Sequence, residues 1–297
     1  MKNFTFLSLI IFSLTTTFAQ EFQGKAYYMS KTKMDPNFGE NIPPERKQRI
    51  MERMKSNLEK NYELDFNSTA SLFYEEERLD NSGGNGRFNF LSFMSPFQGI
   101  LHKEFAAKTF TNRVELFGKI FLIKDSLPQS KWVLSGESKQ IGNYTVYKAT
   151  MSREVPQEVF QFGRQSTEDS KPKMKTVNIT AWFTPQIPVS TGPNKHGGLP
   201  GLILEINTNN TTLLCTKVVM NPKEKMKIKV PSKGTVVTAD EYSKIRTEKI
   251  TEMREVYRRN RGQGGGGQRA ARAAQQAEHE HRRGRRRGRR RDEREGA

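Results

Sequence analysis

Short runs in which apolar and polar residues alternate constrain the fold of this chain more than any other feature. From Tyr62 onward the apolar positions recur with a period of two, and turn residues separate the runs with no helical pattern between most of them. Such spacing favours an antiparallel meander over parallel βαβ units. We therefore expect a mainly β (α+β) domain over residues 20–230, built on a curved antiparallel sheet. The expected strands are Glu21–Met34, Lys103–Phe110, Arg113–Ile123, Trp132–Glu137, Thr145–Met151, Asn178–Phe183, Leu202–Asn207 and Leu213–Met220.

Two segments depart from the strand pattern and are expected to be helical. Pro44 suits the first position of a helix, and apolar residues recur every four positions up to about Asn61, at Ile50, Met54 and Leu58. We expect this helix to pack on the concave face of the sheet, as in the half-barrel of periplasmic lipoprotein carriers, a comparison of fold alone. A second, short helix is expected over residues 238–257, where Thr238 can act as its cap.

The N-terminus has the layout of a secretory signal peptide. Lys2 precedes an apolar stretch, and small and polar residues lead to Ala19, so we expect residues 1–19 to be removed and Gln20 to become the first residue. The apolar stretch is shorter than the roughly 20 residues that span a membrane as a helix. We expect an exported protein that is periplasmic, outer-membrane-associated or extracellular, with no transmembrane helix in the mature chain.

Positive charge is concentrated at the C-terminus. The chain carries a net charge of +18, and residues 258–297 hold 14 Arg against 5 acidic residues, which gives 14 − 5 = +9. A block of like charge repels itself, so we expect a disordered tail. Because the protein is expected to be exported, nucleic acid is an unfavoured partner for the tail, and lipid headgroup phosphates or acidic envelope polymers are the preferred ones. The alternative is a passive, solvated tail that binds nothing. The candidate polyanion-binding residues are Arg282, Arg283, Arg285, Arg286, Arg287, Arg289, Arg290 and Arg291.

The sequence offers little material for catalysis. One Cys and four His exclude a metal site built from several thiolates and leave few residues for a His-rich one. No nucleophile-elbow, zinc-protease or phosphate-loop motif occurs, so we expect no catalytic residue, metal or cofactor. A hydrolase whose site forms only in the fold stays open, with His102 and His196 as the only His of the folded region and a surface position expected for His102. Cys215 is expected to be a buried strand residue.

Two groups of residues are candidates for binding. One group is a dense apolar cluster that consists of Phe88, Phe90, Phe93 and Phe97. We interpret it either as part of the core or as an apolar loop at the mouth of a cavity or against a partner. A second group, Trp182, Lys195 and His196, flanks or lies in a Pro-rich segment that either forms a structural corner or presents these side chains to a ligand. The resulting hypothesis is a non-catalytic envelope protein that binds an apolar ligand or an outer-membrane partner.

A six-residue string carries a family likeness. Gly198-Leu199-Pro200-Gly201-Leu202-Ile203 spells GLPGLI, and it follows Ala181-Trp182-Phe183-Thr184-Pro185. With these residues the chain resembles, over about Gln20–Pro222, the GLPGLI family of secreted Bacteroidetes proteins. That family has no established activity, so the resemblance implies an exported location and no particular chemistry. Members often carry Cys where Val146 stands here, so no thiol role is implied.

The motif also has a physical interpretation. Pro200 and Gly201 suit the two central positions of a type II turn, in which Gly supplies a positive φ. The apolar residues that follow, Leu202 to Leu204, are expected to enter a buried strand. A structural corner is therefore the preferred account of the motif.

Overall fold

A computed structural model describes residues 22–33, 43–76, 97–156, 174–208, 210–224, 226–253, 255–256 and 259. These residues fall into two compact units, one that ends at Ala239 and one that begins at Asp240. The expected signal peptide, Phe88, Phe90, Phe93 and the arginine run of the tail lie outside the described residues.

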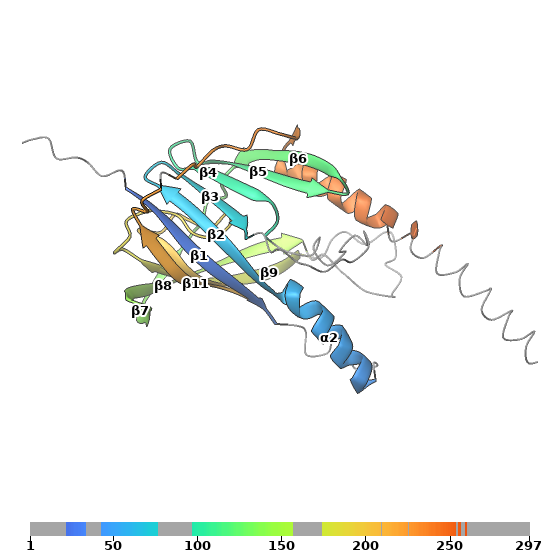
Figure 1. Cartoon of the computed structure of the whole chain (residues 1–297), viewed down its shortest axis with the longest axis horizontal. Coiled ribbons are helices and arrows are strands. Elements are labelled where there is room, and N and C mark those ends of the chain that lie inside the picture. Colours follow the sequence, from blue (N-terminus) through green and yellow to red (C-terminus); the bar gives the residue numbers. More distant parts are fainter. Residues whose placement is uncertain are drawn as a thin grey trace, which may run out of the picture. The chain divides into compact units, whose positions relative to one another are not determined.

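Twelve strands form one open, mixed sheet in the first unit (Figure 1). Strands β1 to β6 form one antiparallel meander, β7 to β11 form a second, and β1 pairs with β11 where the two meet. β12 lies parallel to β6 at one edge, and β7 is the other edge. The mainly β prediction is confirmed, with one parallel pair added. The bounds are β1 Gln23–Thr32, β2 Glu59–Asn67, β3 Ala70–Glu75, β4 Ile100–Glu104, β5 Thr109–Leu116, β6 Lys119–Ser126, β7 Val133–Ile141, β8 Tyr144–Pro156, β9 Met174–Thr184, β10 Leu202–Thr208, β11 Thr211–Met220 and β12 Thr235–Val237.

The connection between β6 and β7 requires the sheet to curl strongly. β6 ends at Ser126 and β7 begins at Val133, yet nine other strands lie between them in the sheet. Ten strand spacings in a flat sheet amount to about 48 Å, whereas the connecting backbone spans at most about 25 Å. The two meanders must therefore turn toward each other, as the expectation of a curved sheet requires.

The β9–β10 loop, residues 185–201, covers the inner face of the curled sheet. Cross-strand partners Ser71, Lys103 and Phe110 lie in one row on that face. Each contacts the loop: Ser71 Oγ lies 3.1 Å from Thr191 Oγ1, Lys103 donates to loop carbonyls, and Lys195 Nζ lies over the Phe110 ring. The loop thus occupies the place that we expected the N-terminal helix to fill.

The N-terminal helix, α2 (Pro44–Leu58), has a different position. It leads without a loop into β2, and its contacts with the sheet are at β1 and β2 (Figure 1). Glu45, Arg46 and Gln48 are exposed. The expectation of a helix covering the concave face is therefore wrong, because the loop already packs there.

Two expected strands are each divided by a turn. The run Lys103–Phe110 breaks between β4 and β5, where Lys108 has a φ of 52°. The run Arg113–Ile123 breaks between β5 and β6, where Phe117 and Gly118 have φ values of 50° and 76°. A two-residue turn at Gly142 and Asn143 joins β7 to β8, with a φ of 57° at the glycine.

The second unit contains a helix in the region where one was expected. Helical backbone begins at Ala239, directly after Thr238, and continues to residue 253. The amide of Ala239, the last residue of the first unit, donates to Asp125 Oδ2 at 3.2 Å. Over the described part of the chain, neither helix has the length and apolarity needed to cross a bilayer.

Candidate functional site

The β9–β10 loop is ordered by hydrogen bonds within itself. Val189 N donates to Ile187 O and Thr191 N donates to Val189 O, both at 2.8 Å, so the Pro-rich segment makes successive tight turns. The return to β10 is fixed by the amides of Leu202 and Ile203, which donate to Ile187 O and Thr191 O. The inward side chains of Ile187, Val189 and Thr191 are each buried. Prolines that cannot pair in a sheet thus form a compact loop instead of two longer strands.

Lys103 fastens this loop to β4. Its side chain is 2% exposed, and Nζ donates to Gly192 O at 2.6 Å and to His196 O at 2.9 Å. Among the described residues no carboxylate pairs with the ammonium. Burial without a counter-charge therefore lowers the pKa of Lys103 to about 7. Local sequence pattern does not indicate this role, because Lys103 follows His102 at the start of an expected strand.

The neighbours of Lys103 within the loop are also basic. His196 is buried, and burial together with the charges of Lys103 and Arg153 lowers its pKa to about 3. Burial also lowers the pKa of Lys195, whose Nζ lies 3.9 Å from the centre of the Phe110 ring and is attracted by Asp125. Lys195 and His196 are thus held by the fold of the loop and its packing on the sheet.

The GLPGLI residues form the tightest corner of the loop. Gly201 has a φ of 154°, and a Cβ atom there would lie 2.1 Å from Thr184 O. A positive φ at Gly201 agrees with the expectation, but its value differs from the +80° of a type II turn. Leu199, Leu202 and Ile203 are buried at this corner. The motif therefore allows two backbone segments to approach more closely than a side chain permits.

Trp182 does not join Lys195 and His196. Its neighbours Ala181 and Phe183 belong to the buried core cluster, so Trp182 points to the opposite face of β9. There Lys139 Nζ lies 4.3 Å from the centre of the Trp182 ring and forms an ion pair with Glu205. The predicted binding group is therefore divided between the two faces of the sheet.

Two other aromatic residues serve packing. Phe97, the only member of the phenylalanine cluster among the described residues, is buried with its ring 5.8 Å from that of Tyr62. Trp132 Nε1 donates to Gly197 O at 2.9 Å and so ties the start of β7 to the loop. Phe97 thus fits the interpretation of that cluster as core.

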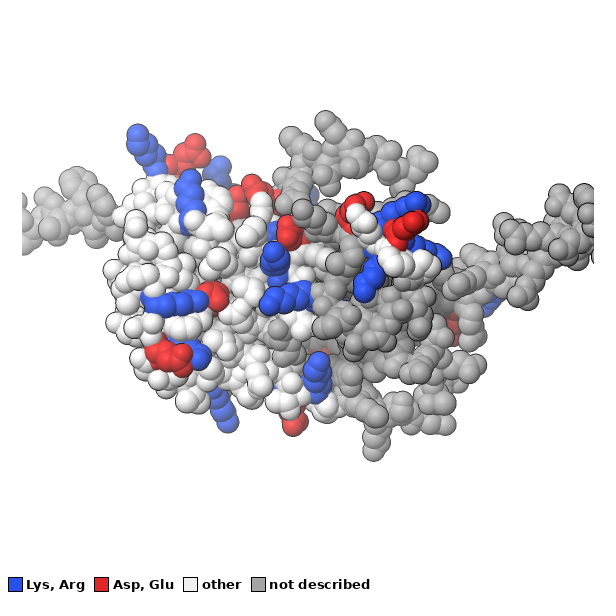
Figure 2. All heavy atoms as spheres, turned by 90° about the horizontal axis from the view of Figure 1, so that it is seen from below, with Lys and Arg blue, Asp and Glu red and all other residues white. Residues whose placement is uncertain are grey.

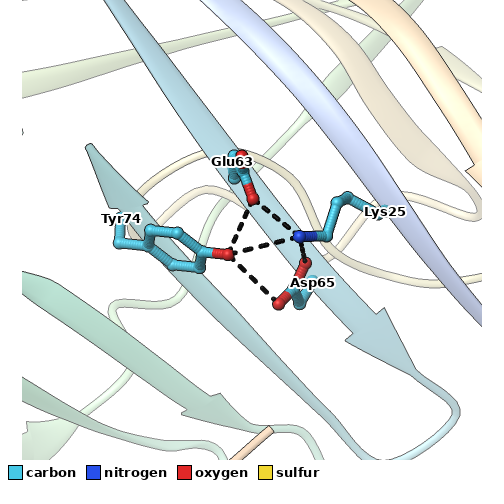
Figure 3. A network of polar contacts seen from close by, with 4 residues as sticks. All are labelled: Lys25, Glu63, Asp65 and Tyr74. Carbon is cyan, nitrogen blue, oxygen red and sulfur yellow. Dashed lines mark hydrogen bonds and ion pairs between the residues drawn. The ribbon is translucent and has the colours of Figure 1, made fainter. Parts of the chain in front are cut away.

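A half-buried polar network lies on the outer face of β1, β2 and β3 (Figure 3). Lys25 Nζ donates to Glu63 Oε2 at 2.7 Å and lies 3.4 Å from Asp65 Oδ1, while Tyr74 Oη donates to the same Glu63 oxygen at 2.7 Å. Burial raises the pKa of Asp65, whereas the hydrogen bonds from Lys25 and Tyr74 outweigh burial and lower that of Glu63. The network links three strands, as a structural network does, but Asp65 Oδ1 is buried and has only its ion pair with Lys25 and no hydrogen bond.

The two histidines cannot act together. His102 and Lys103 are adjacent in β4 and point to opposite faces, so His102 lies on the face away from His196. His102 is 5% exposed, which corrects the expectation of a surface position. His196 lies beside cations instead of the carboxylate that would orient a histidine base. Among the described residues, no three His, Cys, Asp or Glu side chains are placed to hold a metal ion. Cys215 is buried as expected, and burial raises its pKa to about 12.

Fold and loop together define an open, curled β-sheet domain whose inner face is covered by its own β9–β10 loop. Residues 132–205 match a family described as a protein of unknown function (Porph_ging). The matched range begins at Trp132 and ends at Glu205, so it contains the whole loop, the strand β9 before it and the first part of β10 after it.

Similarity to solved structures is distant. Two crystal forms of PNGF-II, in space groups P21 and C2, show 15% and 14% sequence identity, each with a TM-score of 0.45. The similarity covers 75% and 76% of this chain, which spans about a third of the length of either PNGF-II chain (33% and 32%). Among curated proteins, none matches the chain.

Proposed function

We propose that this protein is a non-catalytic, exported envelope protein of the GLPGLI type that binds a partner protein. One observation carries the proposal: the inner face of the sheet, where a half-barrel would hold an apolar ligand, is packed against the protein's own loop. Ser71, Lys103 and Phe110 all contact that loop. This arrangement favours the partner over the apolar ligand among the alternatives that the sequence left open.

The edge strand β7 is the best-supported surface for such a partner. Val133 and Leu134 point to opposite faces of β7 and are 66% and 60% exposed, and Tyr147 on the adjoining β8, on the same face as Leu134, is 42% exposed. The register of β7 against β8 shifts between Leu134 and Ser138, where Gly136 has a φ of 74°. A bulge of this kind discourages indiscriminate strand pairing at a sheet edge. Side chains, more than the edge backbone, would then select the partner.

A site-specific crosslinking experiment tests this surface. A photoreactive residue is placed at Val133 in the full chain, and a matched control carries it at Val236, which is 60% exposed on the opposite edge strand β12. We expect one envelope protein to be crosslinked from Val133, and Leu134→Ser to reduce that product without changing the unfolding midpoint. Equal products from both positions would contradict the proposal.

The Arg-rich tail is proposed to tether the protein to anionic surfaces. A basic residue near an anionic membrane contributes about 1 kcal/mol of binding free energy, and eight arginines lie between residues 282 and 291. Replacing all eight with Gln in the full chain should weaken binding to phosphatidylglycerol vesicles at low salt and leave the unfolding midpoint unchanged. Vesicle binding equal to that of the unchanged chain would refute the tether.

A further inference from the structure

The connection between β11 and β12, residues 221–234, is unusually rich in lysine. It contains five Lys and one Glu. Four of these lysines are described and exposed: Lys223, Lys227, Lys229 and Lys233. The connection belongs to the first unit and is separate in sequence from the arginine run of the tail. It therefore places positive charge on the folded domain itself.

Apolar and basic side chains alternate in this connection. Met226 and Ile228 are partly buried, whereas Lys227 and Lys229 between and beside them are exposed. The amide of Lys229 donates to Lys227 O at 3.0 Å, so the backbone turns tightly at Ile228. The partly buried apolar residues hold the segment against the domain, while the lysines beside them lie in solvent. Val230 follows with 52% of its surface exposed, so an apolar side chain is also accessible beside Lys229.

The lysines of this connection differ from several strand lysines in their ionic partners. On the sheet, Lys25 pairs with Glu63, Lys60 with Glu75, and Lys148 with Glu137. The face in Figure 2 shows several basic side chains directly beside acidic ones. Within the described part of the chain, none of the four lysines of residues 221–234 has an ion-pair partner. Lys227 and Lys229 lie two residues apart on either side of the turn at Ile228, so these like charges repel one another until an external anion binds.

We propose that the β11–β12 connection is a membrane-contact surface that binds anionic lipid headgroups. The lysines supply the attraction to headgroup phosphates, which is the usual role of a polybasic segment near a membrane. The exposed Val230 favours a lipid surface over a soluble polymer, because an apolar side chain among the lysines gains by entering the headgroup region. This contact goes beyond the tail tether and does not depend on it.

The first test removes the lysines from a chain in which the tail no longer contributes. In the full chain with its eight tail arginines changed to Gln, Lys223, Lys227, Lys229 and Lys233 are also changed to Gln. A control chain instead carries Gln at four exposed lysines elsewhere, at positions 108, 119, 124 and 175. We expect the first set to weaken partition onto phosphatidylglycerol vesicles on the order of a thousandfold and the control set to have much less effect. Equal losses from both sets, or no vesicle binding before the lysines are changed, would overturn the proposal.

The second test reports where the protein touches the membrane. A Val230→Cys chain is labelled with an environment-sensitive dye, and Val133→Cys serves as the control; the native Cys215 is 6% exposed and shielded from labelling. Phosphatidylglycerol vesicles should shift the emission at position 230 to the blue, and neither phosphatidylcholine vesicles nor soluble polyphosphate should do so. The label at position 133 should not shift. A shift with polyphosphate alone, or equal shifts at both positions, would refute the membrane contact. If the test of the arginine tail fails while both of these tests succeed, the membrane contact at residues 221–234 still stands.

Discussion

Stability should rise with pH between 7 and 8.5 because of the buried Lys103. In the folded protein the pKa of this lysine is lowered to about 7, from 10.5 for an exposed lysine. Between these two values the unfolded chain binds more protons than the folded one, so the free energy of unfolding increases with pH. Integrating a single site with these two pKa values gives an increase of about 1.5 kcal/mol from pH 7 to pH 8.5.

Other titrating groups change the free energy of unfolding little between pH 7 and pH 8.5. The folded pKa of His196 is lowered to about 3, so that residue destabilises the fold mainly below its ordinary pKa of 6.5. Burial raises the pKa values of Cys215 and Tyr28, and these groups reduce stability only toward and above their ordinary values of 9.0 and 10.0. Burial lowers the pKa of Lys195, which acts in the same direction as Lys103.

Urea unfolding at pH 7 and pH 8.5 measures the effect. Lys103→Met keeps the length of the side chain and removes its titration, so most of the increase should disappear. Lys124→Met, which removes an exposed lysine from β6, should retain it. An unchanged pH dependence in Lys103→Met would refute the assignment. If that variant does not fold, a flat pH dependence in the unaltered protein would refute it equally.

Three further substitutions test the packing around the loop. Gly201→Val should lower the free energy of unfolding by about 3 kcal/mol or more, because the new side chain is strained at a positive φ and also clashes with Thr184 O. An unchanged urea midpoint would show that the backbone at residue 201 does not approach Thr184 so closely. Trp182→Ala should lower the free energy of unfolding by about 1–2 kcal/mol, less than the 3–5 kcal/mol of a core tryptophan, because its ring lies on the outer face beneath Lys139. A decrease of about 3–5 kcal/mol in calorimetry would contradict that position. Tyr28→Phe removes a buried hydroxyl that donates at 2.7 Å to a carbonyl of β10 and should cost about 1–3 kcal/mol in urea unfolding; full stability would mean that water replaces the hydroxyl.

Local pattern predicted the strands well where each turn had a clear signal. Gly142 marked the β7–β8 hairpin, because a two-residue turn needs a positive φ that glycine adopts without strain. The turn at Phe117 was missed although Gly118 follows it, because an apolar Phe117 continues the alternation of a strand. Lys108 takes a positive φ with no glycine beside it, so composition gave no warning there.

Contacts between distant segments could not be read from local pattern. Lys103 is polar in sequence, and its burial depends on loop residues 192 and 196, which approach it only after the sheet has curled. The apolar stripe that includes Ile50 and Leu58 predicted a helix correctly, but not which surface the helix meets. The loop that covers the inner face of the sheet is shaped by turns around Pro188 and Pro193. These prolines determine the local course of the backbone, but they do not reveal which part of the sheet the loop packs against.

The central position of β1 has a consequence for the order in which the protein folds. β1 pairs on one side with β2, its neighbour in sequence, and on the other with β11, where Gln23 O accepts from Asn221 N at 2.9 Å. Each meander can assemble from neighbouring segments, whereas this seam closes a loop of nearly the whole domain, and such non-local pairing is slow. Until the seam forms, β1 and β11 are both unpaired edges of apolar strands, open to pairing with other chains. The first strand to be synthesised is thus among the last to gain its second neighbour, and that interval sets the period of greatest exposure to aggregation.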